Sequence, residues 1–207
     1  MKELQFSDTD GNELVKMAKK SVTEFLKNNS KIKIKDSEFN SKFDFSSGIF
    51  VTINKQDSLR GCIGFPLPVK KLSEGLVDAA ISAATQDPRF PPVNADELDQ
   101  IVFEVTVLTP PVEIKVDDPM DYLSIIKVGR DGLIVENEYT SGLLLPQVPM
   151  EYGWDAKEFL CYTCEKAGLY KDAWKDKTTK VSRFEGVIFK EESPNGIIVR
   201  ESSNDFL

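Results

Sequence analysis

The end of the chain carries the feature that most constrains its fold. Residues 180–191 and 196–201 have the pattern of two strands, and Ser193-Pro-Asn-Gly196 between them is a strong hairpin signal. A hairpin of this kind makes the two strands antiparallel. Because helices and other strands are mingled along the rest of the chain, this favours an α+β fold over a doubly wound parallel sheet. We expect mainly antiparallel sheets with flanking helices.

Periodicity places the other elements. Ser7 and Asp10 have the spacing of a capping box, and apolar residues recur at helical spacing through residues 8–28. A second helix is expected from near Val69 to before Pro88, and its buried stripe is Leu72, Leu76, Ala79, Ala80 and Ala83. Further helices are expected over residues 119–124 and 154–167, the latter ending at Gly168, and strands over 49–54, 101–108, 125–128, 133–138 and 141–146. Gly129-Arg-Asp-Gly132 is expected to form a hairpin turn.

We expect a single domain over residues 1–207, built from lobes of approximately 1–115 and 116–207 that share a core, because no linker-like segment divides the chain. Each half places a Gly-apolar strand before a proline break and a helix, in residues 61–84 and 142–167. An internal duplication would produce the same order of elements in both halves, although no residue-level repeat supports one.

Composition excludes many kinds of chemistry. The 207 residues include no histidine, which rules out Ser-His-Asp triads, Cys-His pairs and His-liganded metals within this chain. The formal net charge of −8 disfavours a nucleic-acid partner, since phosphate binding needs a basic face. Two basic stretches, residues 31–35 and 171–180, are interpreted as a solvated strand and a solvated loop. Three cysteines suggest reduced thiols, no stretch approaches transmembrane length, and a cytoplasmic location is expected.

The most suggestive local pattern is Arg60-Gly-Cys-Ile-Gly64. Gly61 and Gly64 would let another molecule approach the backbone closely, and the guanidinium of Arg60 would favour the thiolate of Cys62. The alternative is that Cys62 is a small buried apolar residue and that the glycines serve tight packing.

Several motifs in order resemble the AMMECR family, named for a chromosomal region linked to Alport syndrome with midface hypoplasia and elliptocytosis. They are Leu59-Arg-Gly-Cys-Ile-Gly64, Asp87-Pro-Arg-Phe-Pro-Pro92, Val128-Gly-Arg-Asp-Gly-Leu133, Gly142-Leu-Leu-Leu-Pro-Gln-Val148, Trp154 with Glu158-Phe-Leu160, and Cys161-Tyr-Thr-Cys-Glu-Lys-Ala-Gly-Leu169. The match spans roughly residues 10–190 and is most similar to the archaeal branch. It implies an α+β fold of two lobes and no assigned reaction. The resemblance also implies an association with Memo-like and radical-SAM proteins, because members of the family are often found with them, and this suggests a shared modification pathway.

The polar residues of these motifs allow two interpretations. Arg60 and Arg89, together with Asp87 and Gln147, could line one cleft around Cys62 and bind a carboxylate or phosphate. They could equally form buried ion pairs that tie the proline-rich segment to the sheet. Phe90, which lies between prolines, is expected to fill the core and not to serve as a stacking platform.

Cys161 and Cys164 form a C-x-x-C pattern within the expected last helix. Zinc normally takes four ligands, and without histidine only Cys62 remains as a further soft ligand. A redox pair usually opens a helix, and this pair does not. We expect both cysteines to pack in the core, with no metal bound, and the sequence names no cofactor.

Three functions therefore compete. The first is an enzyme, or the catalytic partner of one, in which Cys62 is a nucleophile, Arg60 orients a small anionic or protein substrate, and Asp87 or a lysine handles protons. The second is a binding module that presents the glycine-rich strand and the proline-rich segment to a partner protein or a small anionic ligand. The third, nucleic-acid binding, is the weakest because of the acidic charge.

Overall fold

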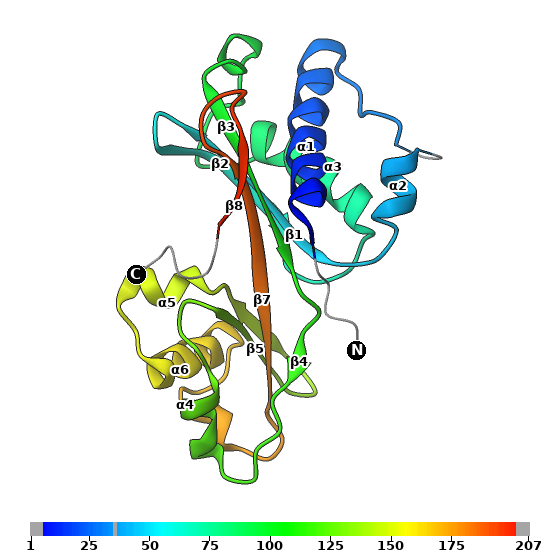
Figure 1. Cartoon of the computed structure of the whole chain (residues 1–207). Helices are drawn as coiled ribbons and strands as arrows, with labels where there is room; N and C mark the ends of the chain where they lie inside the picture. The colour runs from blue at the N-terminus through cyan, green and yellow to red at the C-terminus, as the bar shows by residue number, and fades with distance from the viewer. Residues whose placement is uncertain (1–5, 35–36, 202–207) are drawn as a thin grey trace. The chain divides into compact units, whose positions relative to one another are not determined.

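The computed structural model describes residues 6–34 and 37–201, which form two compact units (Figure 1). Within the described residues, the first unit comprises residues 6–108, without 35 and 36, together with 187–201, and the second comprises residues 109–186. Each unit has its own cluster of buried apolar side chains. The expected mixture of helices with mainly antiparallel strands is confirmed. The lobes proposed from the sequence, with a shared core, stay a prediction.

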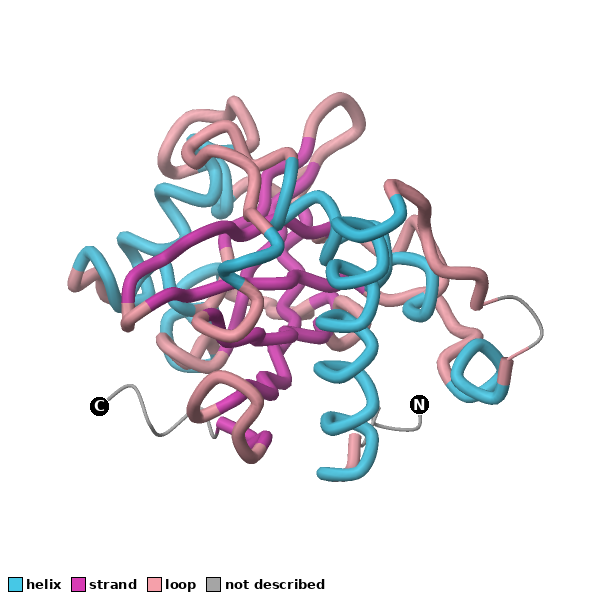
Figure 2. The backbone as a smooth tube through the Cα atoms, turned by 90° about the horizontal axis from the view of Figure 1, so that it is seen from above, coloured by secondary structure: helices cyan, strands magenta, loops and turns pink. Residues whose placement is uncertain are grey.

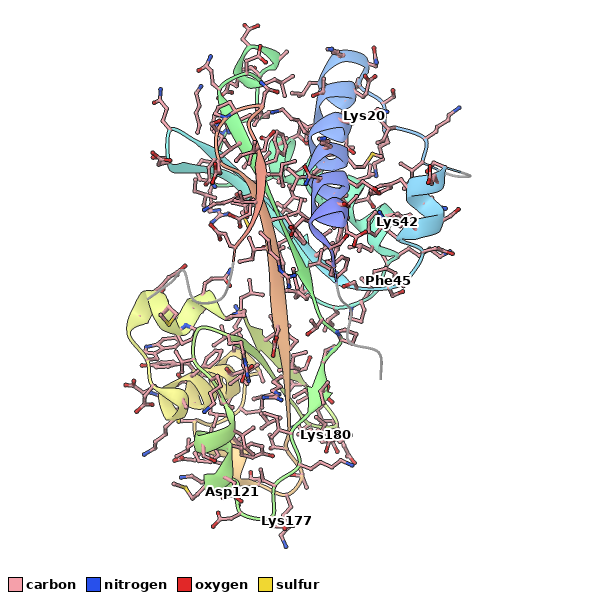
Figure 3. All side chains as sticks on the ribbon, viewed as in Figure 1. Lys20, Lys42, Phe45, Asp121, Lys177 and Lys180 are labelled. Carbon is pink, nitrogen blue, oxygen red and sulfur yellow. The ribbon has the colours of Figure 1, made fainter. Side chains whose placement is uncertain are left out.

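The first unit begins with helix α1 (Asp8–Asn28), as the sequence predicts. Its capping box is present: the Ser7 hydroxyl accepts from the Asp10 N–H at 3.2 Å, and the Ser7 N–H donates to the Asp10 carboxylate at 2.7 Å. One stripe of the helix is buried, formed by Leu14, Val15, Ala18 and Val22. Helix α2 (Glu38–Lys42), which was not predicted, is attached to α1 because Lys42 forms ion pairs with Asp10 and Glu13 (Figure 3).

The sheet of the first unit has the strand order β2-β1-β3-β7, with β8 paired to β7. The strands are β1 (Gly48–Lys55), β2 (Ser58–Phe65), β3 (Ile101–Leu108), residues 187–191 of β7 (Lys180–Glu191), and β8 (Ile198–Glu201). Strand β1 pairs antiparallel with both β2 and β3, and β7 pairs antiparallel with β8. The hairpin predicted at Ser193-Pro-Asn-Gly196 is therefore confirmed.

Helix α3 (Leu72–Thr85) packs with α1 against one face of this sheet, as the tube drawing also shows (Figure 2). The predicted stripe of leucines and alanines on α3 is buried. From the sheet, Val51, Ile53, Phe103 and Val105 alternate into the same core. A short 3-10 helix, η1 (Ala95–Glu97), lies between α3 and β3 in the chain. Residues 31–34 form no strand, contrary to the prediction for 31–35, and Lys35 lies outside the described residues.

In the second unit, β5 (Asp131–Glu136) pairs antiparallel with β6 (Ser141–Leu144) and with residues 180–185 of β7, while β4 (Val112–Glu113) pairs with β7. The helices are η2 (Pro119–Asp121), α4 (Tyr122–Ile125), α5 (Gln147–Tyr152), α6 (Ala156–Lys166) and η3 (Ala173–Lys175). The core gathers Leu133, Val135, Phe159, Leu160 and Trp174. Gly168 ends α6 with φ +76°, as predicted.

Two local predictions in this unit are wrong. Residues 125–128 are not a strand, because Ile125 completes α4 and the Ile126 N–H donates to the Tyr122 carbonyl at 3.0 Å. Gly129-Arg-Asp-Gly132 is not a hairpin turn. Instead, the Lys127 carbonyl accepts from the N–H groups of Arg130 and Asp131, and this turn leads directly into β5.

Within the described residues, no helix combines the length and the apolar character that crossing a membrane requires.

The close approach of β2 to α3 at Gly61 gives a test of the packing. A methyl group on Gly61 would lie 2.1 Å from the carbonyl oxygen of Ala83, a backbone atom that cannot rotate away. We expect Gly61→Ala to lower the free energy of unfolding by about 3 kcal/mol, the upper end of the usual cost of overpacking. Urea denaturation followed by circular dichroism measures this.

Gly75→Ala is the matched control. Its added methyl group would lie 3.2 Å from the Ile49 Cγ2 atom and 3.9 Å from Lys70 Cβ and Phe65 Cδ2, all of them side-chain atoms, and alanine is the better helix former within α3. We expect this variant to lose much less unfolding free energy than Gly61→Ala, because a side chain and not a backbone carbonyl has to move. Equal destabilisation by both substitutions would contradict the proposed role of Gly61.

Candidate functional site

Cys62 lies on the side of the first sheet that α1 and α3 do not cover. In the strand register Cys62 is opposite Thr52 on β1, and Thr52 is opposite Glu104 on β3. Paired residues of antiparallel strands share a face, so these three side chains form one row, here called the thiol row. All three are partly buried. The Thr52 hydroxyl donates a hydrogen bond to Cys62 Sγ at 3.4 Å.

The surroundings of Cys62 raise the pKa of its thiol. Burial is the largest cause, and the nearby carboxylates of Glu104 and Asp87 act in the same direction. The Thr52 hydroxyl and the charge of Arg89 lower this pKa, but by less. Because the ordinary thiol pKa is already above 8, Cys62 is protonated at neutral pH.

Asp87 and Arg89 hold the backbone of Cys62. The Cys62 N–H donates to Asp87 Oδ2 at 2.9 Å, and Arg89 Nη2 donates to the Cys62 carbonyl at 3.3 Å. Arg89 also donates to both oxygens of Asp87, through Nε at 3.0 Å and Nη2 at 2.8 Å. Strand β2 is an edge strand of this sheet, so the two side chains satisfy backbone groups that would otherwise lack a partner strand.

The two charged groups of this pair differ in their exposure to solvent. The hydrogen bonds from the Arg89 guanidinium hold the pKa of the buried Asp87 carboxyl far below its usual range, so Asp87 stays ionised. The Arg89 side chain, in contrast, is 54% exposed. Its bonds to Asp87 and Cys62 use Nε and Nη2, so they do not engage Nη1 or the outer side of the guanidinium. The ring of Phe90 lies 5.5 Å from the guanidinium carbon.

Arg60 does not turn toward the thiol. It is the extra residue of a β-bulge, because Leu59 pairs with Asn54 and Gly61 pairs with Ile53. Its guanidinium donates to both carboxylate oxygens of Glu97, at 3.0 and 3.2 Å, and to the carbonyls of Pro91 and Pro92, at 2.7 and 3.1 Å. Hydrogen bonding from Arg60 lowers the pKa of Glu97 to about 2. Arg60 therefore ties the segment Asp87–Pro92, here called the proline loop, to strand β2.

The two glycines of the motif make close backbone contacts. A methyl group at Gly64 would lie 2.3 Å from the Ile49 carbonyl oxygen, and Gly61 approaches α3 as described above. Phe90 was expected to fill the core, but it is only half-buried and lies outside the first core cluster, with its ring under the Arg89 guanidinium. Gln147 is exposed at the start of α5 in the second unit, so its expected place beside Cys62 stays a prediction.

The C-x-x-C pair lies inside α6. Cys164 is buried in the second core, and burial raises the pKa of its thiol to about 11. Cys161 packs against the same cluster and is partly buried. The described residues hold no group of three or more Cys, Asp or Glu side chains arranged for a metal ion.

Sequence reasoning missed Thr52 and Glu104. A signal was present, because Glu104 is the one charged residue of a mostly apolar strand, and alternation places it on the other face of the sheet from Phe103 and Val105. The proximity of both residues to Cys62 depends on the register of three strands, which local patterns do not contain.

The Asp87–Arg89 pair predicts a pH dependence of stability. The folded-state pKa of Asp87 is depressed, so its contribution is present above the unfolded value of about 3.9 and is lost as the pH falls below it. We expect Asp87→Asn to cost about 1–2 kcal/mol of unfolding free energy at pH 7, since hydrogen bonds to a charged group are lost and Arg89 is partly exposed.

The difference between wild type and Asp87→Asn is expected to shrink when urea denaturation is repeated at pH 3. Asp96→Asn, at an exposed position of η1, serves as the control and should leave the pH profile unchanged. A difference that stays constant from pH 7 to pH 3 would contradict the ionised state assigned to Asp87.

Comparisons with known proteins agree with the resemblance seen in the motifs. The AMMECR1 family matches residues 15–189. A protein of Methanothermobacter thermautotrophicus is 52% identical over 192 residues, covering 93% of this chain and all of that protein, and Protein PYRAB00100 of Pyrococcus abyssi is 48% identical over 203 residues, covering 96% and 98%. The crystal structure of uncharacterized protein PH0010 from Pyrococcus horikoshii is similar with a TM-score of 0.80 and 48% identity, covering 95% of this chain and 98% of that one. The chain belongs to the AMMECR1 family.

Proposed function

We propose that the first unit is a binding module that takes up an anionic group of a small molecule or a partner protein at Arg89, beside the Cys62 thiol. One observation carries this proposal: buried Asp87 fixes the Arg89 guanidinium by two hydrogen bonds while 54% of that side chain stays exposed. An arginine oriented in this way presents its remaining donors without first losing conformational freedom. Carboxylate and phosphate groups match the planar guanidinium.

The neighbours of Arg89 support binding more than catalysis. The pKa of the Cys62 thiol is raised, so the residue offers a neutral S–H group and not a thiolate. Arg60, which was expected to activate the thiol, is paired with Glu97. Cys62 and Phe90 then serve as the walls against which the bound group rests, and Arg89 provides the charge.

A thiol-centred enzyme is the second candidate, and one observation favours it. Thr52 lies between Cys62 and Glu104 in the thiol row: its hydroxyl donates to the thiol sulfur at 3.4 Å, and hydrogen bonding with Thr52 acts to lower the pKa of Glu104. The proton of a hydroxyl can rotate, and turned toward Glu104 it would leave the Thr52 oxygen to accept the thiol proton. Burial raises the pKa of Glu104, which would help that carboxylate take up a proton passed along the thiol row.

Protection of Cys62 from alkylation tests anion binding. Inorganic phosphate is the probe, and sodium chloride of equal ionic strength is the blank. We expect phosphate to slow site-resolved alkylation of Cys62 by iodoacetamide, with half-maximal protection on the order of 1–10 mM. Partly buried Cys161, in the second unit, is the internal reference within each mass spectrum.

Substitution of Arg89 decides whether this protection comes from the proposed site. Arg89→Gln should abolish protection, whereas Arg200→Gln, which removes another exposed cation of the first unit, should keep it. Arg89→Lys retains the charge and should show weaker protection. Equal protection in wild type and Arg89→Gln would refute binding at Arg89.

The same alkylation, measured across pH without phosphate, separates the two candidate functions. A binding module predicts that the rate at Cys62 rises with an inflection at or above the ordinary thiol value of about 8.5. It also predicts that Cys62→Ser still binds phosphate in a direct calorimetric titration. An inflection below pH 7, with Cys62 reacting faster than Cys161, would instead favour the enzyme.

A further inference from the structure

Three aromatic rings and a lysine form one continuous stack in the second unit. Trp154 stacks on Tyr162 of α6, with ring centroids 4.0 Å apart and planes 14° from parallel. Tyr152 stacks on Trp154 at 4.8 Å and 16°. Lys171 Nζ lies 5.0 Å from the centroid of Tyr162. We call these four residues the aromatic stack.

The connection between α5 and α6 builds this stack. Tyr152 is the last residue of α5, and Gly153 follows in the left-handed region at φ +67°, which reverses the chain. The Trp154 N–H then donates to the Pro149 carbonyl at 2.8 Å, and Asp155 caps α6. The rings are therefore held by backbone on both sides and do not depend on one another alone.

The two ends of the stack differ in what covers them. Trp154 covers one face of Tyr162, so Lys171 lies over the other face, where a cation is attracted to the ring. At the opposite end Tyr152 is 67% exposed. One end of the stack thus already holds a cation from the chain itself, and the other end presents an exposed ring.

The residues next to Tyr152 in the chain are mostly acidic. Residues 147–158 contain Glu151, Asp155 and Glu158 but a single basic residue, Lys157. All three carboxylates are exposed, and the capping box fixes two of them: the Asp155 N–H donates to Glu158 at 3.1 Å and the Glu158 N–H to Asp155 at 2.8 Å. These three acidic residues, which lie on both sides of the exposed Tyr152 in the chain and are here called the acidic rim, make the segment complementary to a cation.

We propose that Tyr152 and its acidic rim bind an arginine side chain of a partner peptide. A guanidinium is planar, so it can lie flat on the tyrosine ring while its N–H groups donate to the carboxylates. A lysine ammonium has no such plane, and a quaternary ammonium cannot donate hydrogen bonds. This site lies in the other unit from Arg89 and prefers the opposite charge, so it does not rest on the proposed function of the first unit.

Fluorescence of the full chain tests this proposal. The chain has two tryptophans; Trp174 is buried, so Trp154 within the stack is the one that reports a ligand on Tyr152. The probe is a blocked Gly-Arg-Gly-Arg-Gly peptide, compared with its lysine counterpart and with choline chloride at equal ionic strength. We expect the arginine peptide to change the emission with saturation and to bind more tightly than the other two.

Variants assign the binding to Tyr152. Tyr152→Ala should weaken the arginine peptide about two- to fivefold per stacked arginine, and Tyr152→Phe should bind like the wild type. Glu151→Gln, outside the capping box, should weaken binding and reduce its salt dependence. Tyr139→Ala removes another strongly exposed tyrosine of this unit and should have no effect.

Each remaining outcome overturns the proposal. If Tyr152→Ala, with wild-type near-ultraviolet circular dichroism, binds as tightly as the wild type, the ring does not hold the arginine. If the lysine peptide or choline binds as tightly as the arginine peptide, the site recognises positive charge in general. If the emission does not change with any peptide, and calorimetry detects no heat of binding, the aromatic stack only stabilises the α5–α6 connection.

Discussion

The candidate site depends on the hydrogen bonds that the Asp87 carboxylate accepts. This carboxylate is buried, accepts hydrogen bonds from the backbone of Cys62 and from the side chain of Arg89, and stays ionised because of them. This one group thereby satisfies the Cys62 N–H at the edge of strand β2, attaches the proline loop to that strand and orients a half-exposed guanidinium. Without it, the Cys62 N–H would lack this partner and Arg89 would be free to adopt many rotamers.

The two arginines near the thiol have unequal roles because their carboxylate partners are placed differently. Glu97 and two proline carbonyls take up the donors of Arg60, whose side chain is only 13% exposed, so little of it is available to a ligand. Asp87 binds only the Nε and Nη2 side of the Arg89 guanidinium, and the other side can meet a ligand. A motif that combines arginine, glycine and cysteine therefore does not by itself indicate an activated thiol. The burial of the thiol and the position of the counter-charges decide this, and here burial, the largest cause, together with Glu104 and Asp87 keeps the thiol neutral.

Much of the fold could be predicted because its signals are local. A capping box and helical spacing gave the bounds of α1, alternation gave those of β3 and β7, and a turn signal gave the final hairpin. Helix α5 was missed because Pro146 and Pro149 suggested an irregular segment, although proline is tolerated in the first turn of a helix. The site residues Thr52 and Glu104, and the pairing of Arg60 with Glu97, depend on contacts between distant segments. No local pattern contains such contacts.

The second unit uses the same device as Asp87, which clarifies what is distinctive about the first. Asp131 is fully buried, accepts the Lys127 N–H at 2.8 Å, and binds Arg130 through both carboxylate oxygens at 2.7 and 3.0 Å. In both units a buried aspartate joins a nearby arginine to a backbone N–H. Arg130 also faces Glu185, at 3.4 Å, so a second carboxylate neutralises it further. Within the described residues, Arg89 forms its ion pair with Asp87 alone, and the nearby Cys62 thiol is uncharged. This difference in neutralisation makes Arg89, and not Arg130, the stronger candidate for binding an external anion.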